Sequence, residues 1–180
     1  MDIKIIQNNR LKRSFYIRDV LEVAPELPGK ILAVKKNNKI ERYLLTEVEA
    51  YRGEEDLACH ACKGKTKRNA VMYEQGGLIY VYLIYGMYWM LNFVTGKKNE
   101  PQAVLIRGIE GFNGPGKLTK HLLIDNSYYG EDLIISDRIW VEEGIKNNYK
   151  IKSLPRIGID YAGDYWKNIP WRFAISEYLK

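Results

Sequence analysis

Residues 76–96, GGLIYVYLIYGMYWMLNFVTG, constrain the fold of this chain more than any other segment. The stretch begins and ends at glycines, is rich in aromatic and β-branched residues, and is interrupted once, at Gly86. This pattern predicts a β-hairpin that turns at Gly86. Tyr85, Met87 and Tyr88 surround the turn, where small polar residues are usual. An apolar tip of this kind is expected to be buried under another element or to insert into another molecule.

A second strand-rich segment, residues 30–51, predicts another hairpin that turns at the asparagines of its KNNK sequence. Alternation along its second strand gives one face with Tyr43, Leu45, Glu47, Glu49 and Tyr51, and another with Leu44, Thr46, Val48 and Ala50. The side chain of Glu47 is expected to face solvent. Glu49 lies where the strand ends beside a loop, which is a common place for functional side chains.

The remaining predicted elements are helices over residues 17–24 and 116–123 and strands over residues 102–110, 132–137 and 156–163. The first helix is expected to end near Pro25, because a proline disfavours helical geometry in the residue before it. Arg107 is aligned with apolar neighbours in its strand. We therefore expect its guanidinium to pair with a carboxylate or to face an anion.

The length of 180 residues fits one domain, and no linker, repeat or low-complexity tract divides it, so we predict a single domain over residues 1–180. Lys and Arg exceed Asp and Glu by 28 − 22 = 6, which favours a nucleic acid over an anionic membrane as the partner. No apolar run matches a signal peptide or a membrane span. We expect an intracellular protein, cytoplasmic or nucleoid-associated, with no membrane contact.

Residues 57–67, LACHACKGKTK, place both cysteines, Cys59 and Cys62, on either side of His60. A structural zinc site needs four ligands, and no second pair follows at the usual spacing. The arrangement also differs from the H-x-E and P-C-x-x-C motifs of zinc-dependent deaminases. We predict no metal site, two free thiols and a separate role for His60.

The motifs present and absent argue against a serine hydrolase and a P-loop nucleotidase, and favour an enzyme that acts on a nucleobase. Neither a G-x-S-x-G motif nor a P-loop appears. What remains is a carboxylate, a histidine, a strand arginine, fourteen tyrosines against four phenylalanines, and the basic loop KGKTKR at residues 63–68. This set suits acid–base chemistry on a flipped nucleobase, because rings stack on the base, a carboxylate activates water and cations hold phosphates.

Long, ordered motifs across residues 15–173 resemble those of the 3-methyladenine DNA glycosylase family of the alkyladenine type. They read TEVEAYRGEEDLACHACKGKTKRNAVMYEQGGLIYVYLIYGMYWMLN, AVLIRGIE, GPGKL, RIGIDYAG and PWRF. The resemblance implies a single mixed α/β (α+β) domain with a curved antiparallel β-sheet, surrounding helices and a protruding β-hairpin that enters the DNA minor groove. One departure is TKRN at residues 66–69, where the family often has a proline before the Arg-Asn pair.

The resemblance also implies a role for each matching residue. In the catalytic group, Glu49 matches the general base, Arg107 the arginine near the attacking water and the backbone phosphate, and Ile159 the main-chain carbonyl that helps hold this water. In the base pocket, Tyr51 and Tyr82 match the stacking rings, His60 the contact at the pocket edge, and Asn92 the side chain that disfavours the exocyclic amine of guanine.

For DNA, the resemblance matches Tyr85 to the hairpin residue that wedges into the gap left by the flipped nucleotide. Met87 and Tyr88 accompany it at the tip, and Lys65, Lys67 and Arg68 form the DNA-facing loop.

The function expected on these grounds is that of a repair glycosylase acting as a monomer, without a cofactor, on damaged double-stranded DNA. Water activated by Glu49 would hydrolyse the N-glycosidic bond and leave an abasic site. The expected substrates are 3-methyladenine and 7-methylguanine, with hypoxanthine and ethenoadenine as further candidates. Two alternatives stay open: a non-catalytic nucleic-acid-binding module, and a base hydrolase directed at RNA.

Overall fold

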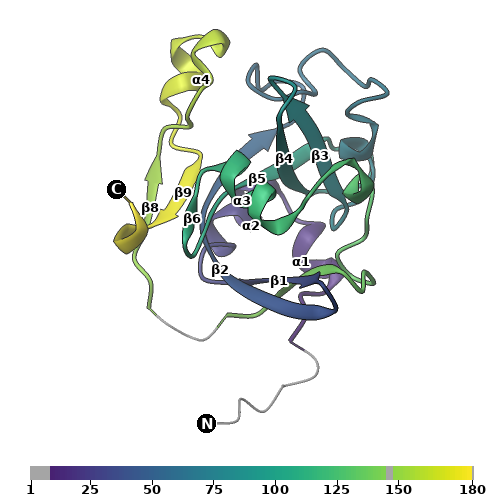
Figure 1. Ribbon diagram of the computed structural model, residues 1–180. Coiled ribbons are helices and arrows are strands. Elements are labelled where there is room, and N and C mark those ends of the chain that lie inside the picture. The colour runs from purple at the N-terminus through teal and green to yellow at the C-terminus, as the bar shows by residue number, and fades with distance from the viewer. Residues whose placement is uncertain (1–8, 145–147, 180) are drawn as a thin grey trace.

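Antiparallel strands make up most of the regular structure in this computed structural model, which describes residues 9–144 and 148–179 (Figure 1). The strands are β1 Ile31–Lys36, β2 Lys39–Arg52, β3 Ile79–Ile84, β4 Tyr88–Val94, β5 Gln102–Ile109, β6 Phe112–Asn113, β7 Ile139–Glu142, β8 Ile151–Leu154 and β9 Arg172–Ile175. They pair in the order β3-β4-β5-β2-β1-β7, with β6 beside β5 and β9 between β2 and β8. The helices are α1 Arg13–Tyr16, α2 Val20–Glu26, α3 Pro115–Leu122 and α4 Asp164–Asn168, and 3₁₀ turns form at Ala70–Tyr73, Asn126–Tyr128, Asp160–Ala162 and Ser176–Tyr178. The predicted class, a mixed α/β domain with an antiparallel sheet, is confirmed.

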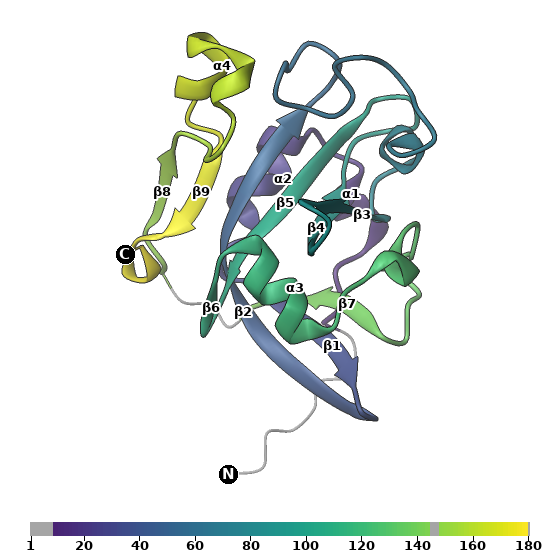
Figure 2. The same ribbon diagram turned by 45° about the horizontal axis from the view of Figure 1, so that its top comes forward.

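Strand β2 is long enough to belong to both halves of the sheet. Its first half pairs with β1, and its second half pairs with β5 and β9. Register shifts on both sides of Glu47 mark a β-bulge in this strand, whose curved course is visible in Figure 2. The bulge moves side chains to the other face, so Leu45 packs in the same apolar core as Val48 and Ala50. The alternation predicted between Leu45 and Val48 is therefore wrong.

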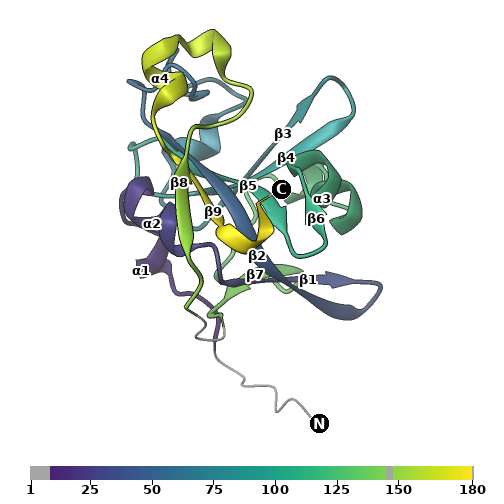
Figure 3. The ribbon, with the colours of Figure 1, turned by 90° about the vertical axis from the view of Figure 1, so that its left-hand side faces the viewer.

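The hairpin of β3 and β4 is confirmed, with its turn at the predicted place. Ile84 pairs with Tyr88, and between them Tyr85 and Gly86 take positive φ angles of 51° and 68°. Glycine suits this left-handed geometry, whereas a tyrosine adopts it rarely. The tip projects from the sheet (Figure 3) and leaves Tyr85 and Met87 85% and 65% exposed. Of the two expected arrangements, the tip is therefore exposed rather than buried under another element.

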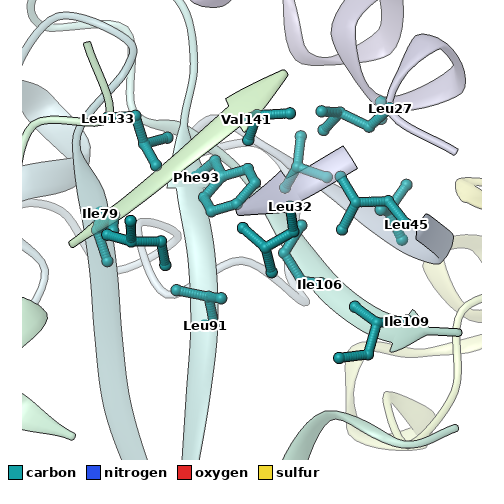
Figure 4. Packing of buried hydrophobic residues seen from close by; sticks show 14 of the residues in the cluster. Leu27, Leu32, Leu45, Ile79, Leu91, Phe93, Ile106, Ile109, Leu133 and Val141 are labelled. Atoms are coloured by element: carbon teal, nitrogen blue, oxygen red, sulfur yellow. The ribbon is translucent and has the colours of Figure 1, made fainter. Parts of the chain in front are cut away.

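The largest apolar core joins the first helices to the sheet. Figure 4 shows Leu27, at the end of α2, beside Leu32 of β1 and Leu45 of β2, with Phe93 of β4 and Ile106 of β5 close by. All five side chains are completely buried. Burying a leucine or phenylalanine side chain contributes about 1.5–3 kcal/mol, so this core provides much of the support for the strand ends that carry the site.

Helix α2 begins and ends later than predicted, while α3 lies within one residue of its predicted position. The Asp19 side chain accepts the Leu21 N–H at 2.9 Å and caps α2, so its first residue is Val20. Pro25 lies inside the helix. In so short a helix a proline in the last turn removes one backbone hydrogen bond without ending the element.

The strands predicted at residues 132–137 and 156–163 are wrong. The Asp132 side chain accepts the Ile134 N–H at 2.9 Å, which folds the first segment into a turn. The second segment contains the 3₁₀ turn Asp160–Ala162 and two glycines with positive φ, which break an extended backbone. The late strands form instead at β7, β8 and β9.

Candidate active site

A cavity of about 520 Å³ opens beside the β3–β4 hairpin. Its walls come from the end of β2, residues 58–72, strands β3 to β5 and residues 157–161. The hairpin and α4 both project from this end of the molecule (Figures 1 and 3). Eight of the predicted site residues line the cavity: Tyr51, His60, Arg68, Tyr82, Tyr85, Asn92, Arg107 and Ile159. The fold therefore brings together residues that lie far apart in the sequence.

Glu49 lies fully buried at the wall of this cavity. Its Oε2 accepts the Tyr51 hydroxyl at 2.8 Å, and its Oε1 accepts the Ile157 N–H at 2.8 Å and lies 3.4 Å from Arg107 Nη1. All three partners line the cavity. Burial raises the pKa of the Glu49 carboxyl above its usual value, while Arg107 and the two hydrogen bonds oppose that rise. The Glu49 carboxylate is therefore a stronger proton acceptor than that of an ordinary glutamate. Arg107 and the two hydrogen bonds offset part of the cost of burying its negative charge.

Glu47 is buried, so the prediction that it faces solvent is wrong. Its Oε1 accepts from Arg107 Nε at 3.3 Å and from Arg172 Nη1 at 2.9 Å. The bulge at Glu47 turns the side chain toward both arginines, and their charges compensate its burial. Arg107 meets the expectation of a carboxylate partner twice, because its guanidinium lies between Glu47 and Glu49.

Aromatic side chains surround the imidazole of His60. Its ring lies 4.4 Å from that of Tyr82, and its Nδ1 lies 2.8 Å from the Tyr80 hydroxyl. Loss of hydration, together with the nearby Arg68 charge, lowers the pKa of His60 to about 4. His60 is therefore neutral at neutral pH, even though the residue as a whole is exposed to solvent.

Asn92 and Ile159 also line the cavity. The Asn92 Nδ2 donates to the main-chain carbonyls of Tyr80 at 3.1 Å and Met90 at 3.2 Å, which fixes the amide between the hairpin strands. Ile159 is buried, and its carbonyl already accepts the Ala162 N–H at 2.9 Å. A carbonyl oxygen has two lone pairs, so it keeps the capacity to accept one further hydrogen bond.

At the mouth of the cavity, Arg68 donates to the Leu83 carbonyl at 3.2 Å and lies 5.3 Å from the centre of the Tyr82 ring. Lys65 lies over the Tyr73 ring at 5.4 Å and 4.0 Å from Glu74. Lys67 is exposed on the same loop. Of the three predicted loop cations, only Arg68 reaches the cavity.

Sequence reasoning missed four residues around the site. Tyr80 and Tyr161 contribute hydroxyls or rings, and Arg156 and Arg172 contribute buried or partly buried charges. The hairpin pattern could have indicated Tyr80, which alternates with Tyr82. The two arginines follow apolar or proline-rich sequence, but their partners lie 100 residues away for Arg156 and 125 residues away for Arg172.

Within the described ranges, no three His, Cys, Asp or Glu side chains are grouped so that they could hold a metal ion. Cys59 and Cys62 are free thiols, and burial raises the pKa of Cys59 to about 12. A thiol of this pKa is unreactive at neutral pH. None of the described helices has the length and hydropathy needed to cross a bilayer.

An aromatic cavity with a buried carboxylate at its wall and an exposed apolar hairpin at its mouth is typical of proteins that hold a nucleobase outside the stack. The sequence profile of one family, described as methylpurine-DNA glycosylase, matches residues 14–113 and 110–178. The chain belongs to this family.

Curated relatives agree along nearly the whole chain. A protein of Borreliella burgdorferi (strain ZS7) is 41% identical over 179 residues, covering 93% of this chain and 96% of its own length. One from Legionella pneumophila (strain Corby) is 42% identical, covering 93% and 95%. One from Methanocella arvoryzae is 45% identical, covering 91% and 90%. Each carries the name "Putative 3-methyladenine DNA glycosylase".

Proposed function

We propose that this protein is a DNA glycosylase that hydrolyses the N-glycosidic bond of alkylated purines such as 3-methyladenine in duplex DNA. The observation that carries the proposal is the Glu49 carboxylate, buried at the wall of an aromatic cavity and held by Tyr51, Arg107 and the Ile157 N–H. A protein that only binds nucleic acid gains nothing from a buried carboxylate beside stacking rings. Family membership supports the same assignment.

In the proposed reaction, water supplies the oxygen that bonds to C1′ while the bond from C1′ to the base nitrogen breaks. Glu49 takes the proton of this water, and its charge stabilises the positive charge that develops on the sugar. A purine alkylated at N3 or N7 is cationic, so it leaves as a neutral base. Arg107 would lie near the attacking water and the phosphate, and the Ile159 carbonyl would orient the water.

The contacts of Glu49 leave room for a water molecule to bond to it. Its Oε2 accepts the Tyr51 hydroxyl, and an ionised carboxylate oxygen can accept a further hydrogen bond. Tyr51, Arg107 and Ile157, the three partners of Glu49, all line the cavity. A water molecule in the cavity would therefore be able to donate to Oε2 without displacing Tyr51.

Base recognition would rest on the rings of Tyr51 and Tyr82, since an aromatic face attracts a cationic base by about 0.5–2 kcal/mol. His60 is neutral, so it can contact the base without repelling its charge. Asn92 would disfavour the exocyclic amine of guanine. Pocket shape would set the ratio of 3-methyladenine, 7-methylguanine, hypoxanthine and ethenoadenine release.

DNA engagement would begin at the exposed tip, where Tyr85 fills the gap left by the extruded nucleotide and Met87 and Tyr88 pack beside it. Lys65, Lys67 and Arg68 would contact phosphates. Within the described residues, the hydrogen-bond and ion-pair partners of the Glu49 side chain are Tyr51, Ile157 and Arg107, and none of these partners is a lysine. We therefore propose a monofunctional enzyme that leaves an abasic site. We also propose that it acts as a monomer.

The decisive experiment is incubation of the protein with methylated duplex DNA, followed by chromatographic identification of the released bases. We expect 3-methyladenine from the wild type, and a loss of at least about a thousandfold in Glu49→Gln with DNA binding retained. Release by Glu49→Gln at the wild-type rate would refute the role of Glu49. Absence of release by the folded wild type would refute the function, and equal release from methylated RNA would favour the RNA-directed alternative.

A further inference from the structure

Arg156 and Asp56 form an ion pair behind the cavity, and both side chains are fully buried. Arg156 Nη1 donates to Asp56 Oδ2 at 2.6 Å, and Nη2 donates to Oδ1 at 2.9 Å. Two parallel hydrogen bonds between charged groups fix the orientation of the guanidinium plane as well as its position. Removing one partner would leave an uncompensated buried charge.

The guanidinium of Arg156 lies between two rings. Its central carbon is 4.8 Å from the centre of the Tyr51 ring and 5.1 Å from that of Trp171, and Nη1 also donates to the Ala50 carbonyl at 3.0 Å. Tyr51 lines the cavity, whereas the Arg156 side chain is completely buried. Arg156 therefore supports the Tyr51 ring from the side away from the cavity.

Arg156 also precedes Ile157, whose N–H donates to Glu49 Oε1. That N–H belongs to the planar peptide group between Arg156 and Ile157, so its direction is set by the backbone of Arg156. The side chain of Arg156 anchors this backbone through Asp56 and Ala50. A single residue thus connects the stacking ring and the hydrogen bond on the carboxylate.

Asp56 extends the connection to the other wall of the cavity. Its Oδ2 accepts the Arg52 N–H at 3.1 Å, and its Oδ1 accepts the Ala58 N–H at 3.0 Å. Ala58 lines the cavity. The loop that leaves β2 and the segment that ends at Ile159 are therefore joined at one buried pair.

We propose that Arg156 is a positioning residue of this site: paired with Asp56, it holds the Tyr51 ring from behind and aims the Ile157 N–H at Glu49. An effect of Arg156 on base release rests on the proposed function. Its effect on the position of Tyr51 and of the Ile157 N–H does not, because both can be detected through the pKa of Glu49 in the absence of DNA.

The ionisation of Glu49 reports on that environment. The charged and titratable groups that face it or its partners are Glu47, Tyr51, Tyr82, Arg107, Arg156 and Arg172. Loss of the Ile157 hydrogen bond would raise the pKa of Glu49, because that bond favours the charged form. Loss of the Tyr51 hydrogen bond would act in the same direction.

The test variant is Arg156→Lys, which keeps a positive charge beside Asp56 but removes the planar group that lies between the rings and bonds twice. The matched control is Arg13→Lys. Arg13 pairs with Asp132 and donates to the Gly76 carbonyl at 2.9 Å, and neither contact reaches the cavity. If Arg156→Lys does not fold, the double variant Asp56→Asn with Arg156→Gln removes both charges together and is measured in the same way.

The experiment is an NMR titration of ¹³C-labelled glutamate side chains, with the Glu49 signal assigned from Glu49→Gln. We expect the Glu49 midpoint to rise by about one pH unit in Arg156→Lys and to stay unchanged in Arg13→Lys. An unchanged midpoint in the folded Arg156 variant would overturn the proposal, since a merely structural role lowers thermal stability alone.

Single-turnover base release from methylated duplex DNA separates this inference from the proposed function. We expect release at pH 7 to fall about tenfold in Arg156→Lys and to stay near wild type in Arg13→Lys, as a misaligned base or carboxylate predicts. A shifted Glu49 midpoint with no release by the wild type would keep the positioning role and refute the glycosylase. Normal release by Arg156→Lys with an unshifted midpoint would refute the positioning role alone.

Discussion

His60 and Glu49 depart from ordinary ionisation for the same physical reason, with opposite signs. Both lose hydration beside the cavity, and this disfavours the charged form of each. For His60 the charged form is the protonated one, so the pKa falls. For Glu49 the charged form is the deprotonated one, so the pKa rises. At neutral pH the cavity therefore has an uncharged imidazole in its lining and, behind Tyr51 and Arg107, a carboxylate that readily accepts a proton.

Protonation of His60 should destabilise the fold in acid. Its pKa is about 4 in the folded protein and near 6.5 in an unfolded chain, so the unfolded state takes up a proton first as the pH falls. The stability from neutral His60 is present above pH 6.5 and is lost as the pH falls toward 4. Urea unfolding at pH 7 and pH 5 should show a smaller loss in His60→Gln than in the wild type. Equal losses would contradict the low pKa.

The negative charge of Glu47 should affect the pKa of Glu49. Its negative charge raises the pKa of Glu49, and its hydrogen bond draws Arg107 away from Glu49. Glu47→Gln removes both influences, so the acid limb of base release should move to lower pH. The free energy of unfolding should fall by about 1–3 kcal/mol, because Arg172 loses its charged partner. A pH–rate profile beside a urea titration measures both, and an acid limb displaced upward would contradict the prediction.

At the scale of elements, the hairpin tip holds a tyrosine in a conformation that suits glycine or asparagine. Tyr85 has a φ of 51° and is almost fully exposed, so its side chain gains little from packing that could offset the strain. Tyr85→Asn should therefore raise the free energy of unfolding by about 0.5–1 kcal/mol. It should also weaken binding to damaged duplex DNA more than binding to single strands, because it removes the ring proposed to fill the gap left by the flipped nucleotide.

Leu123 offers a matched control for the hairpin variant. It follows α3 with a φ of 57°, is largely exposed and lies outside the cavity lining. Leu123→Asn should give a similar gain in unfolding free energy with unchanged DNA binding. Urea unfolding and fluorescence anisotropy with labelled duplex and single-stranded DNA provide the measurements. Equal loss of duplex and single-strand binding in Tyr85→Asn would rule out the wedge.

Elements and residues with a local signal were predictable from the sequence. The hairpin follows from its composition and its glycine, and the contact of Glu49 with Tyr51 follows from their spacing along one strand. Glu47 was misplaced because a bulge depends on how β2 pairs with β5 and β9, which alternation does not encode. Arg156 and Arg172 could not be placed, since their partners lie 100 and 125 residues away in the sequence.

At the scale of the whole molecule, the net charge of +6 predicts salt-sensitive DNA binding. Lys67 is exposed on the loop beside the cavity, so Lys67→Ala should reduce the slope of log affinity against log salt by about one. Lys39→Ala is the control, because this exposed lysine lies at the β1–β2 turn, far from the hairpin tip (Figure 1). Equal slopes for the two variants would remove Lys67 from the proposed DNA contacts.

Residues 157–161 and strand β9, which come late in the sequence, complete the site. Arg172 pairs with Glu47, and residues 157–159 complete the cavity wall beside Glu49. During synthesis the hairpin and β2 therefore leave the ribosome well before these partners, while Glu47 still lacks Arg172 and Asp56 still lacks Arg156. Contacts so distant in sequence slow folding. The nascent protein should thus stay without a formed pocket until residues 157–172 emerge, so a translation pause just before that segment would delay formation of the pocket more than an earlier one.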